Sequence, residues 1–129
     1  MIEGCVGETL SALVAEARLQ HAIDADMRAA FAMIAEDEAR HAELAWRFVG
    51  WGIREGGAPV REAAARALRE VEGAMPSFVD PSLAGVSVRT IREHGLLDEA
   101  SARAVVDAAW RDVIAPCAAV ILEGVALAA

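Results

Sequence analysis

The segment Asp37-Glu38-Ala39-Arg40-His41 is the most informative part of this sequence for the expected fold and site. It lies within a run whose apolar residues recur at helical spacing, namely Met27, Phe31, Ile34, Leu44 and Phe48. That period predicts one long amphipathic helix. In a helix, Glu38 and His41 lie one turn apart along the axis and about 60° apart around it. Both side chains can therefore reach one metal ion.

Glu8 is the predicted partner of this pair. An earlier periodic run, from Gly4 to His21, predicts a first helix, and Asp24 or Asp26 supplies an N-cap for the second. If the chain turns near residue 23, residues whose numbers add to about 46 lie at equal height in the two antiparallel helices. Glu8 and Glu38 satisfy that condition, so we expect them side by side.

The surroundings of these three residues are apolar in the sequence. Helical neighbours of Glu8 are Cys5, Ala12, Ala15 and Leu19, and those of Glu38 and His41 are Ile34, Ala42, Ala45 and Phe48. We therefore expect the three groups to be buried in an apolar seam, where unpaired polar groups cost several kcal/mol and a bound metal would stabilise them. The alternative is a buried hydrogen bond between a glutamate and the histidine, with Glu38 at the surface.

The number of ligands predicts an assembly. Di-iron and di-manganese sites in helical bundles use one Glu from each of two helices and a Glu-x-x-His from each of two others. One hairpin supplies half of that set, so a twofold homodimer or a higher homo-oligomer would supply all of it. Oxygen and nitrogen ligands together favour iron, two ions per dimer, or manganese.

The rest of the chain is predicted to be helical and to form one domain over residues 1–129. Residues 3–57 form the metal-binding hairpin, which ends at Gly56-Gly57, and residues 58–73 form a third helix with Pro59 near its start. Glycines and prolines predict a loop over 74–88. Residues 89–129 are expected to hold C-terminal helices, with Pro116 dividing the longer one. The fold class is therefore all-α.

Composition excludes several classes of function. The formal charge of −8 argues against binding to nucleic acid or to anionic membranes, and no segment is long and apolar enough to predict a membrane span. The first residues carry no signal-peptide features, so a cytoplasmic location is expected. The absence of Tyr excludes a tyrosyl-radical mechanism. No Ser-His-Asp, phosphate-loop or dinucleotide motif is present.

With the upstream Glu8, the Asp37–His41 string resembles the ferritin-like di-iron superfamily over roughly residues 3 to 54. The short hairpin is similar to the encapsulated ferritins, whose site forms only across a dimer interface. The resemblance implies that Asp37 orients His41 of the other subunit and that Arg40 adds an ion pair nearby. A solvated salt bridge of Arg40 with Glu36 or Glu43 is the alternative. The family usually carries two helix pairs in one chain, whereas this sequence shows one.

Two classes of function follow. The first is a di-iron or di-manganese protein with Glu8, Glu38 and His41 as ligands, acting as a ferroxidase or as an oxidase that uses dioxygen or peroxide. The second is a metal-free helical module whose Ala-rich faces mediate oligomerisation. In either case the C-terminal helices could mediate further assembly.

Overall fold

The computed structural model describes residues 1–78 and 80–123, and every regular element in them is helical. The chain begins with a π-helical turn, η1 (Glu3–Gly7), that continues into α1 (Glu8–His21). A short connection leads to α2 (Ala25–Glu72). Asp24 caps α2, because its side chain accepts a hydrogen bond from the Met27 N–H over 2.9 Å. The predicted hairpin and its turn near residue 23 are confirmed.

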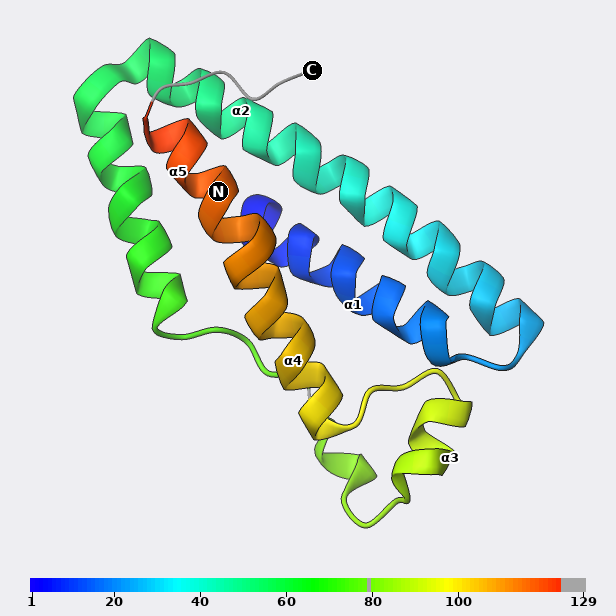
Figure 1. Cartoon of the computed structure of the whole chain (residues 1–129). Helices are drawn as coiled ribbons and strands as arrows, with labels where there is room; N and C mark the ends of the chain where they lie inside the picture. The colour runs from blue at the N-terminus through cyan, green and yellow to red at the C-terminus, as the bar shows by residue number, and fades with distance from the viewer. Residues whose placement is uncertain (79, 124–129) are drawn as a thin grey trace.

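Helix α2 consists of two arms that meet at Gly57. This glycine has φ 65° and ψ −148°, a conformation that essentially only glycine adopts, and Pro59 follows it in the second arm. The first arm, residues 25–56, runs antiparallel to α1, and the second arm, residues 58–72, turns back beside the C-terminal helices (Figure 1). The break predicted at Gly56-Gly57 is therefore confirmed.

The segment after α2 contains the short elements η2 (Pro81–Leu83) and α3 (Val88–Glu93), which ends at Gly95 with φ 67°. Asp98 then caps α4 (Glu99–Ala109), a π-helical turn η3 (Trp110–Ile114) follows, and α5 (Ala115–Leu122) completes the described chain. The expected C-terminal helices are present up to residue 122. The part of that expectation from residue 124 onward lies outside the described residues.

Proline explains the interruption between α4 and α5. Pro116 has no N–H to donate, and in a regular α-helix its ring would collide with the carbonyl of Asp112. The wider π turn Trp110–Ile114 occupies this position, one turn before the proline. The rod formed by α4, η3 and α5 therefore stays helical but departs from regular α geometry just before Pro116.

The main core forms where α1, both arms of α2 and the C-terminal rod meet. Its largest fully buried side chains are Cys5, Val6, Leu10, Ile53, Ile114 and Ile121. Trp110 joins the rod to the end of α2, since its Nε1 donates to Glu72 over 3.1 Å. The C-terminal helices therefore cover one side of the α1–α2 hairpin. The metal-ligand candidates Glu8, Glu38 and His41 lie on the hairpin outside this core.

Candidate metal centre

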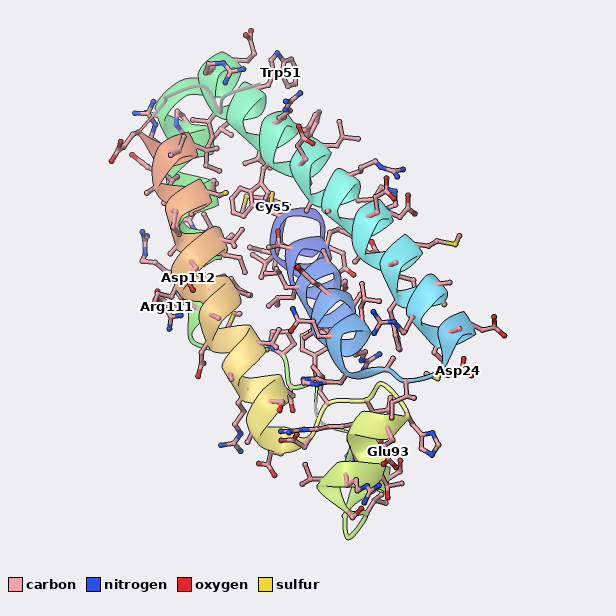
Figure 2. The ribbon with its side chains drawn as sticks, turned by 45° about the vertical axis from the view of Figure 1, so that its right-hand side comes forward. Cys5, Asp24, Trp51, Glu93, Arg111 and Asp112 are labelled. Carbon is pink, nitrogen blue, oxygen red and sulfur yellow. The ribbon has the colours of Figure 1, made fainter. Side chains whose placement is uncertain are left out.

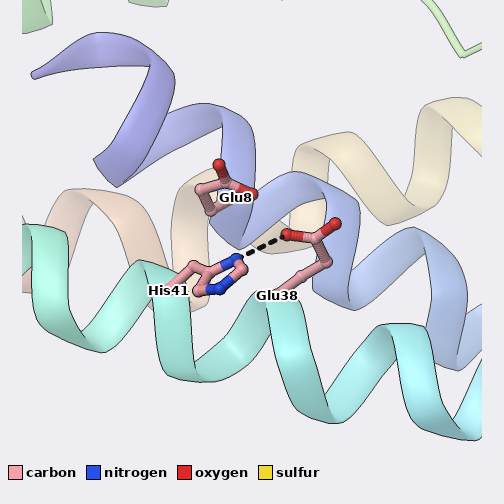
Figure 3. A group of neighbouring side chains, drawn as sticks. All are labelled: Glu8, Glu38 and His41. Atoms are coloured by element: carbon pink, nitrogen blue, oxygen red, sulfur yellow. Dashed lines mark hydrogen bonds and ion pairs between the residues drawn. The ribbon is translucent and has the colours of Figure 1, made fainter.

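Glu8, Glu38 and His41 come together as the sequence predicted. One ligand atom from each side chain can be chosen so that all of them lie within 4.8 Å of one another. Figure 3 shows Glu8 on α1 facing Glu38 and His41 on α2. The Nδ1 of His41 lies 3.4 Å from the Glu38 Oε2, one helical turn away. We call these three residues the acidic cluster.

Two features of the hairpin place Glu8 opposite Glu38. The antiparallel packing of α1 on the first arm of α2 brings the two positions to the same height, as the turn near residue 23 requires. The neighbouring Thr9 is held by Trp46, whose Nε1 donates to the Thr9 Oγ1 over 3.2 Å in the buried interior. Thr9 in turn donates to the backbone carbonyl of Cys5 over 2.6 Å. This chain of hydrogen bonds fixes α1 against α2 next to the cluster.

Hydrogen bonding between the two carboxyl groups alters their acidity. The hydrogen bond to Glu38 raises the pKa of Glu8, and partial burial and the nearby negative charge raise it further. The same hydrogen bond, with help from His41, lowers the pKa of Glu38. The two carboxyl groups therefore differ in acidity, and a bound cation would favour the ionised form of both.

The expected burial of the cluster is wrong for a single chain. Glu8 and Glu38 are half-buried, and the His41 side chain is 55% exposed. The reason is that Ile34 and Phe48, which were expected to surround the site, point to solvent rather than into the core. Water can satisfy these polar groups in the isolated chain, so a metal is not needed there to offset a burial cost.

Asp37 and Arg40 lie beside the cluster on the outer side of α2. The Asp37 Oδ2 is 4.0 Å from the Nε2 of His41 in the same chain, and both side chains are exposed. Arg40 pairs with Glu36, and its Nη1 lies 3.7 Å from Asp37. The solvated ion pair considered for Arg40 is therefore present, and the role of Asp37 toward a second subunit stays a prediction.

The outer face of α2 carries a feature that the sequence pattern did not separate from the core. Large apolar side chains that point to solvent follow one stripe of the first arm, interrupted only by Asp37 and His41. This outer seam consists of Ile34, Asp37, His41, Leu44, Phe48 and Trp51. Its members alternate three and four residues apart, the spacing of a helix that packs along another helix. Leu44 and Phe48 are 68% and 65% exposed.

Helical periodicity alone could not reveal this seam, because it marks apolar stripes without saying which stripe faces the interior. Trp46 and Trp51 illustrate the difference. Trp46 is buried against α1, whereas Trp51 lies on the outer seam, near the opposite end of the first arm from Asp24 (Figure 2). The ring centroids of Trp51 and Phe48 are 5.6 Å apart, so the two aromatic rings form one apolar patch.

The acidic cluster could hold a metal ion. Its carboxylate oxygens and imidazole nitrogen are common metal ligands, and one such atom from each side chain lies within 4.8 Å of the others. Among the described residues, no helix is long and apolar enough to cross a membrane. Comparison of the chain with family models, with curated proteins and with solved structures finds no match.

Proposed function

We propose that two copies of this chain associate through the outer seam and hold a pair of iron or manganese ions between their acidic clusters. The observation that carries the proposal is the convergence of Glu8, Glu38 and His41 within 4.8 Å. Each copy supplies two carboxylates and one imidazole. A twofold pair supplies the four carboxylates and two imidazoles that a carboxylate-bridged dimetal site uses.

The outer seam supports a second copy as the partner. His41 lies midway between Ile34 and Phe48, seven positions from each. In an antiparallel pair of α2 helices centred on His41, Ile34 of one copy would lie opposite Phe48 of the partner subunit. The two polar positions of the seam, Asp37 and His41, would then lie near the twofold axis of the dimer, with the acidic cluster. Apolar contacts between the two copies would flank them on both sides.

Burial of the cluster and the negative charge of each copy would both oppose association in such a dimer. The second α2 helix would remove the cluster from water, so the burial cost that is absent in one chain would arise in the pair. Each copy also carries a formal charge of −8, which opposes association. Bound divalent cations would offset both effects, and metal binding would therefore favour dimer formation.

The chemistry that we propose is oxidation of Fe(II) by dioxygen or peroxide. Each dioxygen takes four electrons from four Fe(II) ions and, with four protons, leaves as two waters. Glu8 and Glu38 would bind Fe(II) as substrate in their ionised forms, and His41 would act as a terminal ligand. An oxidase that acts on an organic substrate is the variant of this proposal that the same ligands would serve.

Metal content tests the proposal directly. Protein stripped of metal and reloaded with Fe(II) under argon should retain about one iron per chain, which is the content that two ions per dimer require. Glu38→Ala should retain almost none, whereas Glu62→Ala, which removes an exposed carboxylate on the second arm, should behave like the parent protein. Addition of air to the loaded parent should produce ferric absorbance. Equal low iron contents in all variants would exclude the site.

The second candidate is a metal-free interaction module, which the exposed apolar side chains of the outer seam favour by themselves. Light scattering separates the two candidates. The metal-binding proposal expects a dimer that Fe(II) or Mn(II) strengthens and chelator weakens. A dimer that is indifferent to both treatments would favour the interaction module.

A further inference from the structure

A cavity of about 420 Å³ opens on the side of the hairpin that faces the C-terminal rod. Its walls come from α1, the first arm of α2, η3 and α5. The residues that define it are Ala12, Leu13, Ala42, Trp46, Val113 and Cys117. The volume lies within the range of small-molecule sites, roughly 300–1,000 Å³. The proposed iron chemistry makes no use of this cavity.

The cavity does not belong to the outer seam. Ala42 and Trp46 lie on the buried side of α2, whereas His41, Leu44 and Phe48 point outward from it. A second copy docked on the seam would therefore leave the cavity open. The π turn η3 forms part of its wall through Val113, at the point where the C-terminal rod departs from regular α geometry.

The interior of the cavity suits a hydrocarbon chain. The Trp46 Nε1 already donates to Thr9, and the Thr9 hydroxyl already donates to the Cys5 carbonyl, so these polar atoms at the cavity have partners within the protein. The remaining inner wall consists of aliphatic side chains and the Cys117 thiol. A polar ligand group placed here would lose its hydrogen bonds to water, whereas methylene groups would gain burial.

The charged groups at the cavity are Arg47 and Glu43, whose side chains are 47% and 60% exposed and mark its mouth. The Arg47 Nη2 donates to Glu43 over 2.8 Å. A guanidinium group has five N–H donors, so this contact leaves capacity for a second carboxylate. Glu43 is already paired with that arginine, which disfavours it as the partner of a ligand cation.

We infer that this cavity binds a carboxylate with a short hydrocarbon tail, the tail between α1, α2 and η3 and the carboxylate at Arg47. Trp46 forms part of the wall and offers a spectroscopic reporter. Octanoate, kept well below its micelle concentration, serves as the probe, with octanol and octylammonium as comparison ligands. The protein is the full chain with Trp51→Phe and Trp110→Phe, in which Trp46 is the remaining tryptophan.

Octanoate should change the Trp46 emission saturably and bind more tightly than octanol or octylammonium. Arg47→Gln should weaken octanoate about fivefold to tenfold and leave octanol unchanged, because one exposed charge-assisted contact is lost. Arg61→Gln, an exposed arginine outside the cavity, is the matched control and should change nothing. Ala42→Leu should abolish binding by filling the cavity.

Val113→Phe at the partly exposed rim provides a second blocking variant if Ala42→Leu does not fold, and circular dichroism reports folding for both. Absence of a saturable emission change, or binding that survives the folded blocking variants, would overturn the assignment of the site. Tighter binding of octylammonium, or equal loss of octanoate and octanol in Arg47→Gln, would overturn the assignment of the carboxylate to Arg47.

Discussion

The indole Nε1 of Trp46 donates a hydrogen bond to Oγ1 of Thr9 across 3.2 Å, and this contact joins the two helices that carry the acidic cluster. Thr9 is the residue after Glu8, so its position controls where the Glu8 carboxyl lies relative to Glu38. Thr9→Val keeps the shape of the side chain but leaves the buried indole N–H without its acceptor. We expect the free energy of unfolding to fall by about 1–3 kcal/mol.

The same variant should weaken metal binding, because Glu8 would be held less firmly. Urea unfolding and an Fe(II) titration measure the two effects. Ser11→Ala, a partly buried hydroxyl on α1 outside this contact, is the control. Unchanged stability and unchanged Fe(II) affinity in Thr9→Val would show that the hydrogen bond does not position the cluster.

The raised pKa of Glu8 predicts that metal binding depends on pH. The pKa of Glu8 is raised, so its carboxyl stays protonated to higher pH than usual, and a cation must displace that proton. Affinity for Mn(II), which does not oxidise readily under these conditions, should therefore fall as the pH is lowered from about 7 to about 5. Calorimetry in two buffers with different enthalpies of ionisation should detect proton release on binding.

Glu8→Gln provides the control for this experiment. It removes the carboxyl whose pKa is raised, so the remaining Mn(II) binding should be weaker and should depend less on pH. An identical pH dependence in the parent and in Glu8→Gln would show that the Glu8 carboxyl does not cause it.

The exposed position of Phe48 on the outer seam predicts that a charge placed there weakens the proposed dimer. Phe48→Glu places a carboxylate on a 65% exposed apolar position that the proposed dimer would bury. The dimer dissociation constant should rise on the order of 100-fold, which corresponds to about 2.7 kcal/mol. Sedimentation equilibrium measures it.

Val88→Glu is the matched control, because Val88 is 50% exposed on α3 and lies off the seam. Dimerisation should be unaffected by it. If Val88→Glu dissociates the dimer and Phe48→Glu does not, the copies meet through a different face.

The lowered pKa of Asp98 predicts that part of the free energy of unfolding is lost in acid. The Ser101 N–H, with added help from the Ser101 hydroxyl and Arg92, lowers the pKa of Asp98 from 3.8 to about 2. A lowered carboxyl pKa contributes stability above the unfolded value, and that contribution disappears as the pH falls from about 4 to about 2. Asp98→Ala should cost about 2 kcal/mol near neutral pH, and the difference from the parent should shrink across this interval.

Asp80→Ala is the comparison variant. Asp80 also caps a turn, but it is exposed and its element is only Pro81–Leu83. Urea titration of both variants measures the free energy of unfolding, which should fall clearly less in Asp80→Ala than in Asp98→Ala. Equal losses in the two variants would show that the partners of Asp98 do not set its contribution.

The backbone conformation of Gly57 predicts that a side chain at this position would be strained. Gly57→Ala places an L side chain at φ 65° and ψ −148°, which should lower the free energy of unfolding by about 1–3 kcal/mol. Gly52→Ala, within the regular first arm and with open space at its Cβ, should instead raise it by about 0.5–1 kcal/mol. Thermal unfolding of both variants distinguishes them. A similar change in both would mean that the two arms do not need a glycine at their junction.

Sequence patterns alone were enough to predict the helical elements and the convergence of the three metal-ligand candidates. Local physics suffices for these features. Asp24 and Asp98 cap helices through their own side chains, the backbone conformation of Gly57 interrupts α2, and a π turn stands just before Pro116. The position of the turn near residue 23 was enough to place Glu8 opposite Glu38. Helices rise by a fixed distance per residue, so residues equally far from the turn lie at the same height in the two antiparallel helices.

Which apolar stripe of α2 faces the core depends on packing between distant parts of the chain. Ala42 and Trp46 are buried, whereas Leu44 and Phe48 are exposed, although all four recur at helical spacing. The choice depends on where α1 and the C-terminal rod pack, and those contacts join residues far apart in the chain. For the same reason the open side of the acidic cluster, and the cavity beside Arg47, could not be predicted from spacing: both are set by which helices pack there and which do not.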